Sequence, residues 1–337
     1  EALLVLPRIF SEAGYAVTVS DPPYSNYRLV GDYRPFSPYP DIAVKQLMGK
    51  YAVRYKQEHA EFLQWDDEAT SNLVKTRLPV FSLLRTAPPI AREAIYDKGR
   101  YLLMADSSQH LDDFLASYSQ LYYLHDVTDY SADGDTFTMI SNETAHEPVL
   151  LEPPCYEPRD TVAKVHNPLT EYLETTNLGD IATYHVNAAT LLQLARWIQH
   201  LKDEGVYDST RIIIVSDHGH PVHTTFFQDF KKNALRYALF NPLLLVKDFD
   251  AEGPLQEDDR FMTNADAAIM ALSDLDIPMV NPFTEEQMES WIEKDVVSVF
   301  QGGGANFTGN QIEIDPHLSY TIYDDIRVEE HWGPYNE

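Results

Sequence analysis

The chain of 337 residues, 44% of them hydrophobic, is long enough to form one large α/β domain or two smaller ones. Its 53 acidic residues outnumber the 25 basic ones, and the formal net charge of −28 argues against the basic surface that a nucleic-acid-binding protein needs. The single cysteine, Cys155, excludes an intrachain disulfide, and no apolar run is long enough to cross a membrane.

The chain opens with a predicted helix and a predicted strand. Apolar residues at helical spacing predict a helix from Ala2 to Ala13, and β-branched residues predict a strand from Tyr15 to Val19. Residues 21–40 form a loop rich in proline and tyrosine. Within it, Arg28 and Arg34 are either candidate anion contacts or ordinary surface arginines.

Four further elements are expected before the middle of the chain. Asp41 is a suitable N-cap, because its carboxylate can accept hydrogen bonds from the first amides of a helix. The predicted elements are a helix from Asp41 to Gln64, a strand from Leu78 to Leu83, a helix from Pro88 to Asp97 and a helix from Gln109 to Leu124.

A polar loop with a histidine follows the next predicted strand. Residues Asp135 to Ser141 alternate and are rich in strand formers, and the loop from Asn142 to Pro148 contains His146. A histidine here can donate a hydrogen bond to an anionic substrate or act as an acid or base near neutral pH. The alternative is a loop histidine without a role.

The most informative stretch is a helix followed by an apolar strand. The helix is predicted from Tyr184 to Glu204, with Gly205 as its stop. Its expected buried face comprises Ala188, Leu191, Leu192, Ala195, Ile198 and Leu201. The run from Arg211 to His218, RIIIVSDH, then predicts a fully buried strand of a parallel sheet.

Asp217 and His218 lie where this strand ends, which is where ligands bind in α/β sheets. A carboxylate and an imidazole are good ligands for Zn²⁺ or Mn²⁺. Gly219 allows a sharp turn and close passage past a ligand. His220 and His223 are further candidate ligands or phosphate contacts. The alternative is a strand end with a capping aspartate and histidines that face solvent.

The rest of the chain completes an α/β pattern. We expect a strand from Leu243 to Lys247, a helix capped by residues 263–266, a turn and helix start at residues 281–284, and short strands at Gln311 to Ile314 and Leu318 to Tyr323. The glycines at 302–304 lack the spacing of a phosphate-binding loop. The predicted fold is α/β, with a mostly parallel sheet flanked by helices on both faces in residues 1–285 and a small β extension in residues 286–337.

Three segments together resemble the alkaline phosphatase/sulfatase superfamily. They are YHVNAATLLQLARWIQHLKDEGVYDSTRIIIVSDHGH (184–220), ISNETAHEP (140–148), and NPLLLVKDF with FMTNADAAIMAL (241–249 and 261–272). Within the superfamily, the chain looks most like the membrane-anchored branch of lipoteichoic acid synthases and phosphoethanolamine transferases. The resemblance covers residues 1–285.

The resemblance implies a metal-dependent phosphotransferase or hydrolase acting on phosphate or sulfate esters. Asp217 and His218 match two metal ligands of the family, for Mn²⁺ or Zn²⁺, and His146 matches a histidine presented to the substrate phosphate. The family's nucleophile and a further acidic ligand belong before Glu1. We therefore expect the natural protein to extend upstream and this chain alone to be inactive or weakly active.

The resemblance also implies a location and a substrate class. We expect the extracellular face of a bacterial membrane, with anchoring only through an upstream segment, and an anionic ester substrate, such as an envelope lipid or glycan. The alternative is a non-catalytic binding or surface module that keeps the sulfatase-like fold.

Overall fold

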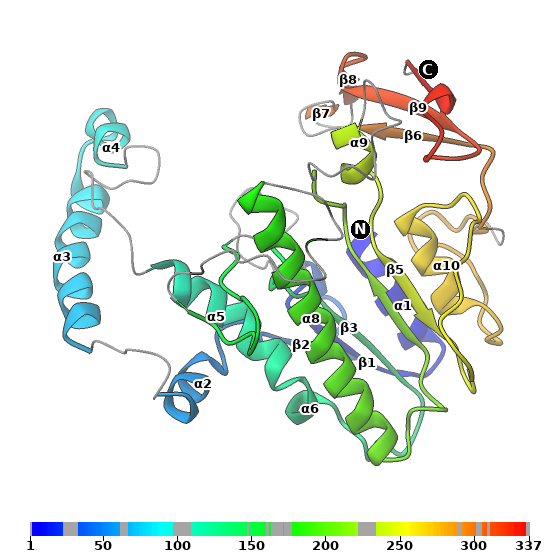
Figure 1. Ribbon diagram of the computed structural model, residues 1–337, viewed down its shortest axis with the longest axis horizontal. Helices are drawn as coiled ribbons and strands as arrows, with labels where there is room; N and C mark the ends of the chain where they lie inside the picture. The colour runs from blue at the N-terminus through cyan, green and yellow to red at the C-terminus, as the bar shows by residue number, and fades with distance from the viewer. Residues whose placement is uncertain are drawn as a thin grey trace.

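The computed structural model describes residues 2–22, 33–60, 67–96, 109–146, 148–159, 162, 171, 177–221, 234–288, 292–300, 305–308 and 311–334. Helices and strands alternate along this part of the chain, so the expected α/β class is confirmed (Figure 1). The described residues also include the short 3₁₀ helices η1 (Ala2–Leu4), η2 (Arg34–Phe36) and η6 (Glu329–His331).

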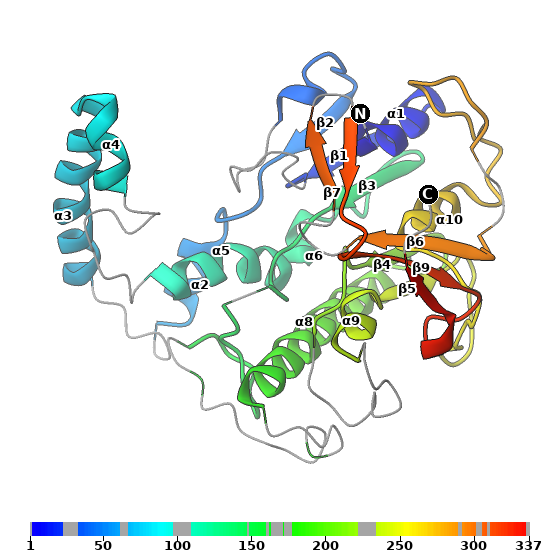
Figure 2. The ribbon, with the colours of Figure 1, turned by 90° about the horizontal axis from the view of Figure 1, so that it is seen from above.

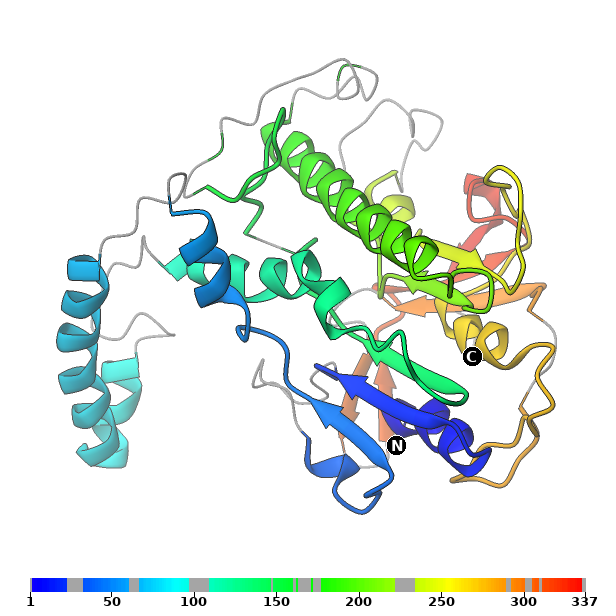
Figure 3. The same cartoon turned by 90° about the horizontal axis from the view of Figure 1, so that it is seen from below.

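The N-terminal part forms a three-stranded parallel sheet. Strand β1 (Ala16–Ser20) is central and pairs with β2 (Ile42–Lys45) on one side and β3 (Thr136–Ile140) on the other. Helix α1 (Val5–Glu12) lies against this sheet (Figure 3), and Phe10 stacks on Phe137 with ring centroids 4.2 Å apart. The predictions of this helix and of strands β1 and β3 are confirmed.

Two predictions in the following segment are wrong. Residues 42–45, predicted as helix, form β2, because Ile42 is buried in the core and the backbone of this segment pairs with β1. Among the described residues of the predicted range, which end at residue 60, only α2 (Ala52–Glu58) is an α-helix. The strand predicted from Leu78 to Leu83 lies inside helix α3 (Asp67–Thr86), since a short apolar run does not distinguish strand from helix. Helices α4 (Pro89–Tyr96) and α5 (Gln109–Tyr122) confirm the other two predictions.

The long helix is present, but it buries a different face from the one predicted. After the short α6 (Leu124–Val127), α8 (Leu178–Asp203) begins at the N-cap Asn177, and Gly205 follows it with a φ of +73°. Only Leu201 of the predicted face is buried. The buried residues are Asp180, Ile181, Ala182, His185, Val186, Ala189, Gln193 and Leu201.

Polar side chains explain this difference. Val186 and Ala189 pack in one core cluster with Tyr118 and Leu115 of α5, and Gln193 Nε2 donates to Tyr118 Oη at 3.0 Å. A buried polar group is stable when it is hydrogen-bonded, so the tertiary partner decides which face of the helix is buried.

The strand that precedes Asp217 is also placed differently from expectation. Strand β4 (Ile212–Val215) pairs antiparallel with β5 (Leu244–Lys247), and of its four residues only Ile212 is buried. Val215 is 44% exposed and Val246 is 45% exposed. The prediction of a fully buried parallel strand is therefore wrong for β4, because its partner is the antiparallel β5, which the sequence pattern does not reveal. Helix α9 (Ala234–Leu239) precedes β5.

The predicted cap before the next helix is confirmed. Thr263 and Asp266 form a capping box, with the Thr263 amide donating to Asp266 Oδ2 at 2.8 Å. The 3₁₀ turn η5 (Asn264–Asp266) leads into α10 (Ala267–Leu272). Residues 281–284 form the expected turn, but no helix starts there.

The C-terminal part contains small antiparallel sheets, which confirms the expected β extension. Strand β9 (Ser319–Tyr323) pairs with β6 (Val296–Phe300) and β10 (Trp332–Pro334), and β7 (Ala305–Thr308) pairs with β8 (Gln311–Ile314) (Figure 2). Within residues 1–285, the described strands form parallel ladders between β1 and β2 and between β1 and β3, and an antiparallel ladder between β4 and β5. The glycines at 302–304 lie outside the described residues. None of the helices in these residues has the length and apolar character that a membrane crossing requires.

Candidate functional site

The end of β4 is held in place from two sides. The Ser216 amide donates to Leu243 O at 3.0 Å, and Ser216 Oγ accepts from the Leu243 amide at 2.8 Å. From the other side, Asn264 Nδ2 donates to the Asp217 carbonyl oxygen at 2.8 Å. The capping segment of α10 therefore fixes the backbone from which Asp217 and His218 project.

Asp217 and His218 are both exposed, and the side-chain atoms through which they could bind a metal ion face each other. Asp217 Oδ1 accepts from the His218 amide at 2.9 Å, and His218 Nδ1 lies 2.7 Å from the Gly219 carbonyl oxygen. A carbonyl only accepts, so Nδ1 carries the proton and the lone pair of a neutral His218 is on Nε2. This atom lies 3.6 Å from Asp217 Oδ2. Two acceptors at this distance repel each other unless a cation lies between them, either a proton on Nε2 or a metal ion.

Gly219 is required by the backbone that passes next to it. Its amide donates to Leu239 O at 2.8 Å, and a Cβ atom added to it would lie 2.0 Å from the carbonyl oxygen of Ala238. The close approach is therefore to the C-terminal end of α9, whereas the sequence suggested a ligand.

The pair fits part of a metal site. An imidazole with Nδ1–H bonded to a carbonyl is the usual arrangement of a histidine that binds metal through Nε2. A catalytic zinc site ordinarily takes three protein ligands. Within the described ranges, no group of three His, Cys, Asp or Glu residues could hold an ion. His220 is exposed and described, while His223 lies outside the described residues. Asp217 and His218 could thus be two of the three protein ligands that such a site needs.

His146 lies in the loop after β3, and helix α5 anchors that loop. Asn142 Nδ2 donates to the Ser117 carbonyl and to Gln120 Oε1, both at 3.0 Å. Gln120 Nε2 donates to Ser141 O at 3.3 Å, and Asn142 Oδ1 accepts from the Thr144 amide at 3.0 Å. The His146 side chain is exposed. His146 follows β3, whereas Asp217 and His218 follow β4, and their joint action stays a prediction.

Two predicted arginine contacts remain predictions. Arg34 is exposed in η2, and Arg28 lies outside the described residues.

Sequence reasoning missed one acidic residue at the carboxyl edge of the parallel sheet. Asp21 follows β1 directly and is buried, and its carboxylate accepts hydrogen bonds from the amides of Leu47 (3.1 Å) and Met48 (3.0 Å). Burial raises the pKa of the Asp21 carboxyl above its ordinary value, although these amides act in the opposite direction. Its position directly after a strand was the available signal. Its oxygens already bind backbone amides, so it fixes the loop after β2.

We expect Asp21 to titrate at a higher pH than Asp258, whose pKa is lowered by a hydrogen bond from Arg260. Side-chain ¹³C NMR, with Asp21→Asn and Asp258→Asn for assignment, would give both midpoints. Because folding raises the pKa of Asp21, its contribution to stability is complete below the unfolded-state pKa and is lost as pH rises through the folded-state pKa. A lower midpoint for Asp21 than for Asp258 would contradict this.

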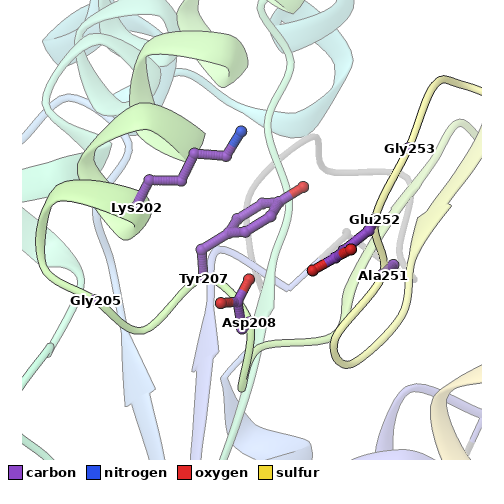
Figure 4. A pocket seen from close by; sticks show the side chains of 7 residues that line it. All are labelled: Lys202, Gly205, Tyr207, Asp208, Ala251, Glu252 and Gly253. Atoms are coloured by element: carbon purple, nitrogen blue, oxygen red, sulfur yellow. The ribbon is translucent and has the colours of Figure 1, made fainter.

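A surface pocket of about 380 Å³ lies elsewhere. Lys202, Tyr207, Asp208 and Glu252 line it (Figure 4). Tyr207 and Asp208 precede β4, whereas Asp217 follows it. The Lys202 and Lys247 ammonium groups lie 4.6 Å and 4.1 Å from the Tyr207 ring centroid. None of the predicted site residues lines this pocket.

Comparison with protein-family models, with curated proteins and with solved structures finds no match for this chain.

Proposed function

We propose that this chain belongs to a metal-dependent phosphotransferase or hydrolase of the alkaline phosphatase/sulfatase type. One observation supports this most directly. His218 Nδ1 is hydrogen-bonded to the Gly219 carbonyl oxygen, and His218 Nε2 faces Asp217 Oδ2 at 3.6 Å. Nε2 and Oδ2 are therefore both directed at one position for a cation. The sequence resemblance supports the same assignment, and the further expected architecture, a mostly parallel sheet with helices on both faces, is part of this proposal.

In this proposal, each residue has a defined role. Asp217 and His218 hold a divalent ion, Mn²⁺ or Zn²⁺, which when bound supplies positive charge next to the oxygens of the ester. The Gly219 carbonyl keeps the proton on Nδ1 and thereby keeps Nε2 available. His146, on the loop that α5 anchors, contacts the anionic group of the substrate. Such contacts matter here because the chain has a net charge of −28, which repels an anionic ester.

The substrate class and location extend the proposal. We propose an anionic ester, a phosphate or sulfate ester of an envelope lipid or glycan, acted on at the extracellular face of a bacterial membrane. These assignments come from the resemblance to the membrane-anchored branch.

Metal titration tests the proposal. We expect Mn²⁺ or Zn²⁺ to raise the thermal stability of the chain, by about 2.7 kcal/mol at a free metal concentration 100 times the Kd. Asp217→Ala and His218→Ala should abolish the stabilisation and the bound metal measured by equilibrium dialysis. His317→Ala, which removes an exposed histidine of the C-terminal part, is the control and should leave both unchanged. Equal stabilisation of the wild type and both site variants would contradict the proposal.

A non-catalytic module with the same fold is the second candidate. The observation that favours it is that only two donors converge at the end of β4 in the described residues. It predicts that neither metal changes the unfolding temperature of the wild-type chain.

A further inference from the structure

Helices α3 and α4 form a helical arm (residues 67–96) that stands apart from the rest of the molecule. All three views show it at one edge of the structure (Figures 1, 2 and 3). Arg92 Nε donates to the Ala87 carbonyl oxygen at 2.9 Å, which ties the start of α4 to the end of α3, and Ala87 and Ile95 are buried. The arm is therefore held together by its own contacts.

The arm has exposed apolar side chains, and its four basic residues lie between residues 75 and 96, whereas Asp67 and Glu68 lie at its start. Ile90 is 93% exposed, and Leu78 and Leu83 are exposed as well. Between residues 75 and 96 there are four basic residues and one acidic residue, in a chain with more than twice as many acidic as basic residues. Arg85 lies seven positions after Leu78 and thus on the same helical face. Exposed apolar side chains with basic neighbours indicate an interaction surface for an acidic partner.

A complementary surface exists on the same molecule. Residues 248–259 (the acidic loop) contain six acidic residues and no basic one, and all twelve are exposed. Leu255 is 82% exposed, and Phe249 is exposed too. Three of the carboxylates are paired with arginines, through Arg211–Asp248, Arg260–Asp258 and Arg327–Asp259. Asp250, Glu252 and Glu257 have no ion pair among the described residues.

The arm and the acidic loop lie on opposite sides of the molecule, so they cannot meet within one chain. The loop follows β5, on the side away from α3 and α4 in each view (Figures 1, 2 and 3). Two copies, however, can bring the arm of one against the loop of the other. This arrangement covers apolar side chains on both surfaces and brings opposite charges together.

We propose that the helical arm of one copy docks on the acidic loop of a second copy, which gives head-to-tail self-association. An anionic bilayer is the less favoured occupant. Helices that lie on membranes separate their basic and apolar faces, whereas Leu78 and Arg85 share one face.

Sedimentation velocity over a concentration series tests the proposal. We expect the wild-type chain to self-associate, and association to weaken about tenfold or more between about 0.05 M and about 0.5 M salt. An arm variant (Leu78→Ser, Arg85→Glu, Ile90→Ser) and a loop variant (Glu252→Lys, Leu255→Ser, Glu257→Lys) should each remain monomeric. All six side chains are exposed, so both variants should fold, which circular dichroism checks.

Mixing the two variants gives the sharper result. The arm variant keeps an intact loop and the loop variant keeps an intact arm, so an equimolar mixture should form a one-to-one complex although neither variant associates alone. The matched control on α8 (Leu191→Ser, Leu192→Ser, Arg196→Glu) should associate like the wild type. A monomeric wild type, a loop variant that still associates, or a mixture without complex would overturn the proposal. Vesicles of anionic lipid that bind a monomeric wild type but not the arm variant would identify a bilayer as the occupant instead.

Discussion

Gly219→Ala should disrupt the end of β4 and destabilise the protein by about 3 kcal/mol, at the upper end of what overpacking usually costs. The new methyl group would lie 2.0 Å from the Ala238 carbonyl oxygen and 2.9 Å from that of Asn241. Both are backbone atoms that cannot move away by rotating a side chain. The end of α9 and the residues that follow it must therefore shift, and the hydrogen bond from the Gly219 amide to Leu239 O must lengthen or break.

Urea unfolding of the variant would measure this cost. Gly134→Ala is a matched control, because a Cβ atom at Gly134 meets nothing within 4 Å, and we expect a change within about 0.5 kcal/mol. Any metal stabilisation of the wild type should also be lost in Gly219→Ala, since His218 depends on the Gly219 carbonyl for its orientation. Equal unfolding midpoints of the two glycine variants would show that the backbone at 238–241 is not the constraint.

Arg211→Met should be similarly destabilising, by about 3 kcal/mol, because it leaves a charge and several backbone acceptors without their donor. The Arg211 side chain is only 7% exposed. Its Nη1 donates to the carbonyl oxygens of Met270 (3.0 Å), Ala271 (3.2 Å) and Ser273, at the end of α10. Nε donates to Asp248 Oδ1 at 2.8 Å. One guanidinium thus joins the start of β4 to the C-terminus of a helix, where a cation is favourable.

A second arginine provides the control for this prediction. Arg260 is 47% exposed and pairs with Asp258, and exposed pairs contribute little, so Arg260→Met should cost less than about 1 kcal/mol. Arg211→Lys keeps the charge but lacks the planar group of donors, and its unfolding free energy should lie between those of the wild type and Arg211→Met. The prediction fails if both methionine variants unfold at the same denaturant concentration.

Local signals in the sequence were sufficient for several elements. The helix that begins the chain, the strands β1 and β3, and the capping box at Thr263 and Asp266 were all predicted where they occur. Each depends on short-range chemistry: apolar periodicity, β-branched side chains, or a side chain that accepts hydrogen bonds from the first amides of a helix. The glycine stop after α8 belongs to the same class, since its φ of +73° suits a residue without a Cβ atom.

Local signals did not predict which strands pair, in which direction they run, or which side chains are buried. The apolar run at 212–215 indicated a strand, but its partner is the antiparallel β5, and two of the exposed apolar side chains belong to this ladder. The buried face of α8 includes His185 and Gln193, which hydropathy assigns to the surface. Both are stable in the core because of hydrogen bonds to Tyr156 and Tyr118, residues that are distant in sequence.

The candidate site shows the same division. The sequence by itself determined the overall α/β class and the residue types Asp217, His218 and Gly219 at a strand end. Only the tertiary structure decided that Gly219 is needed for a backbone close by, and that α5 anchors the loop of His146. The physical reason is range: residue type and periodicity act over a few neighbours, whereas pairing partners, buried hydrogen bonds and close backbone approach depend on groups that come together only when the chain folds.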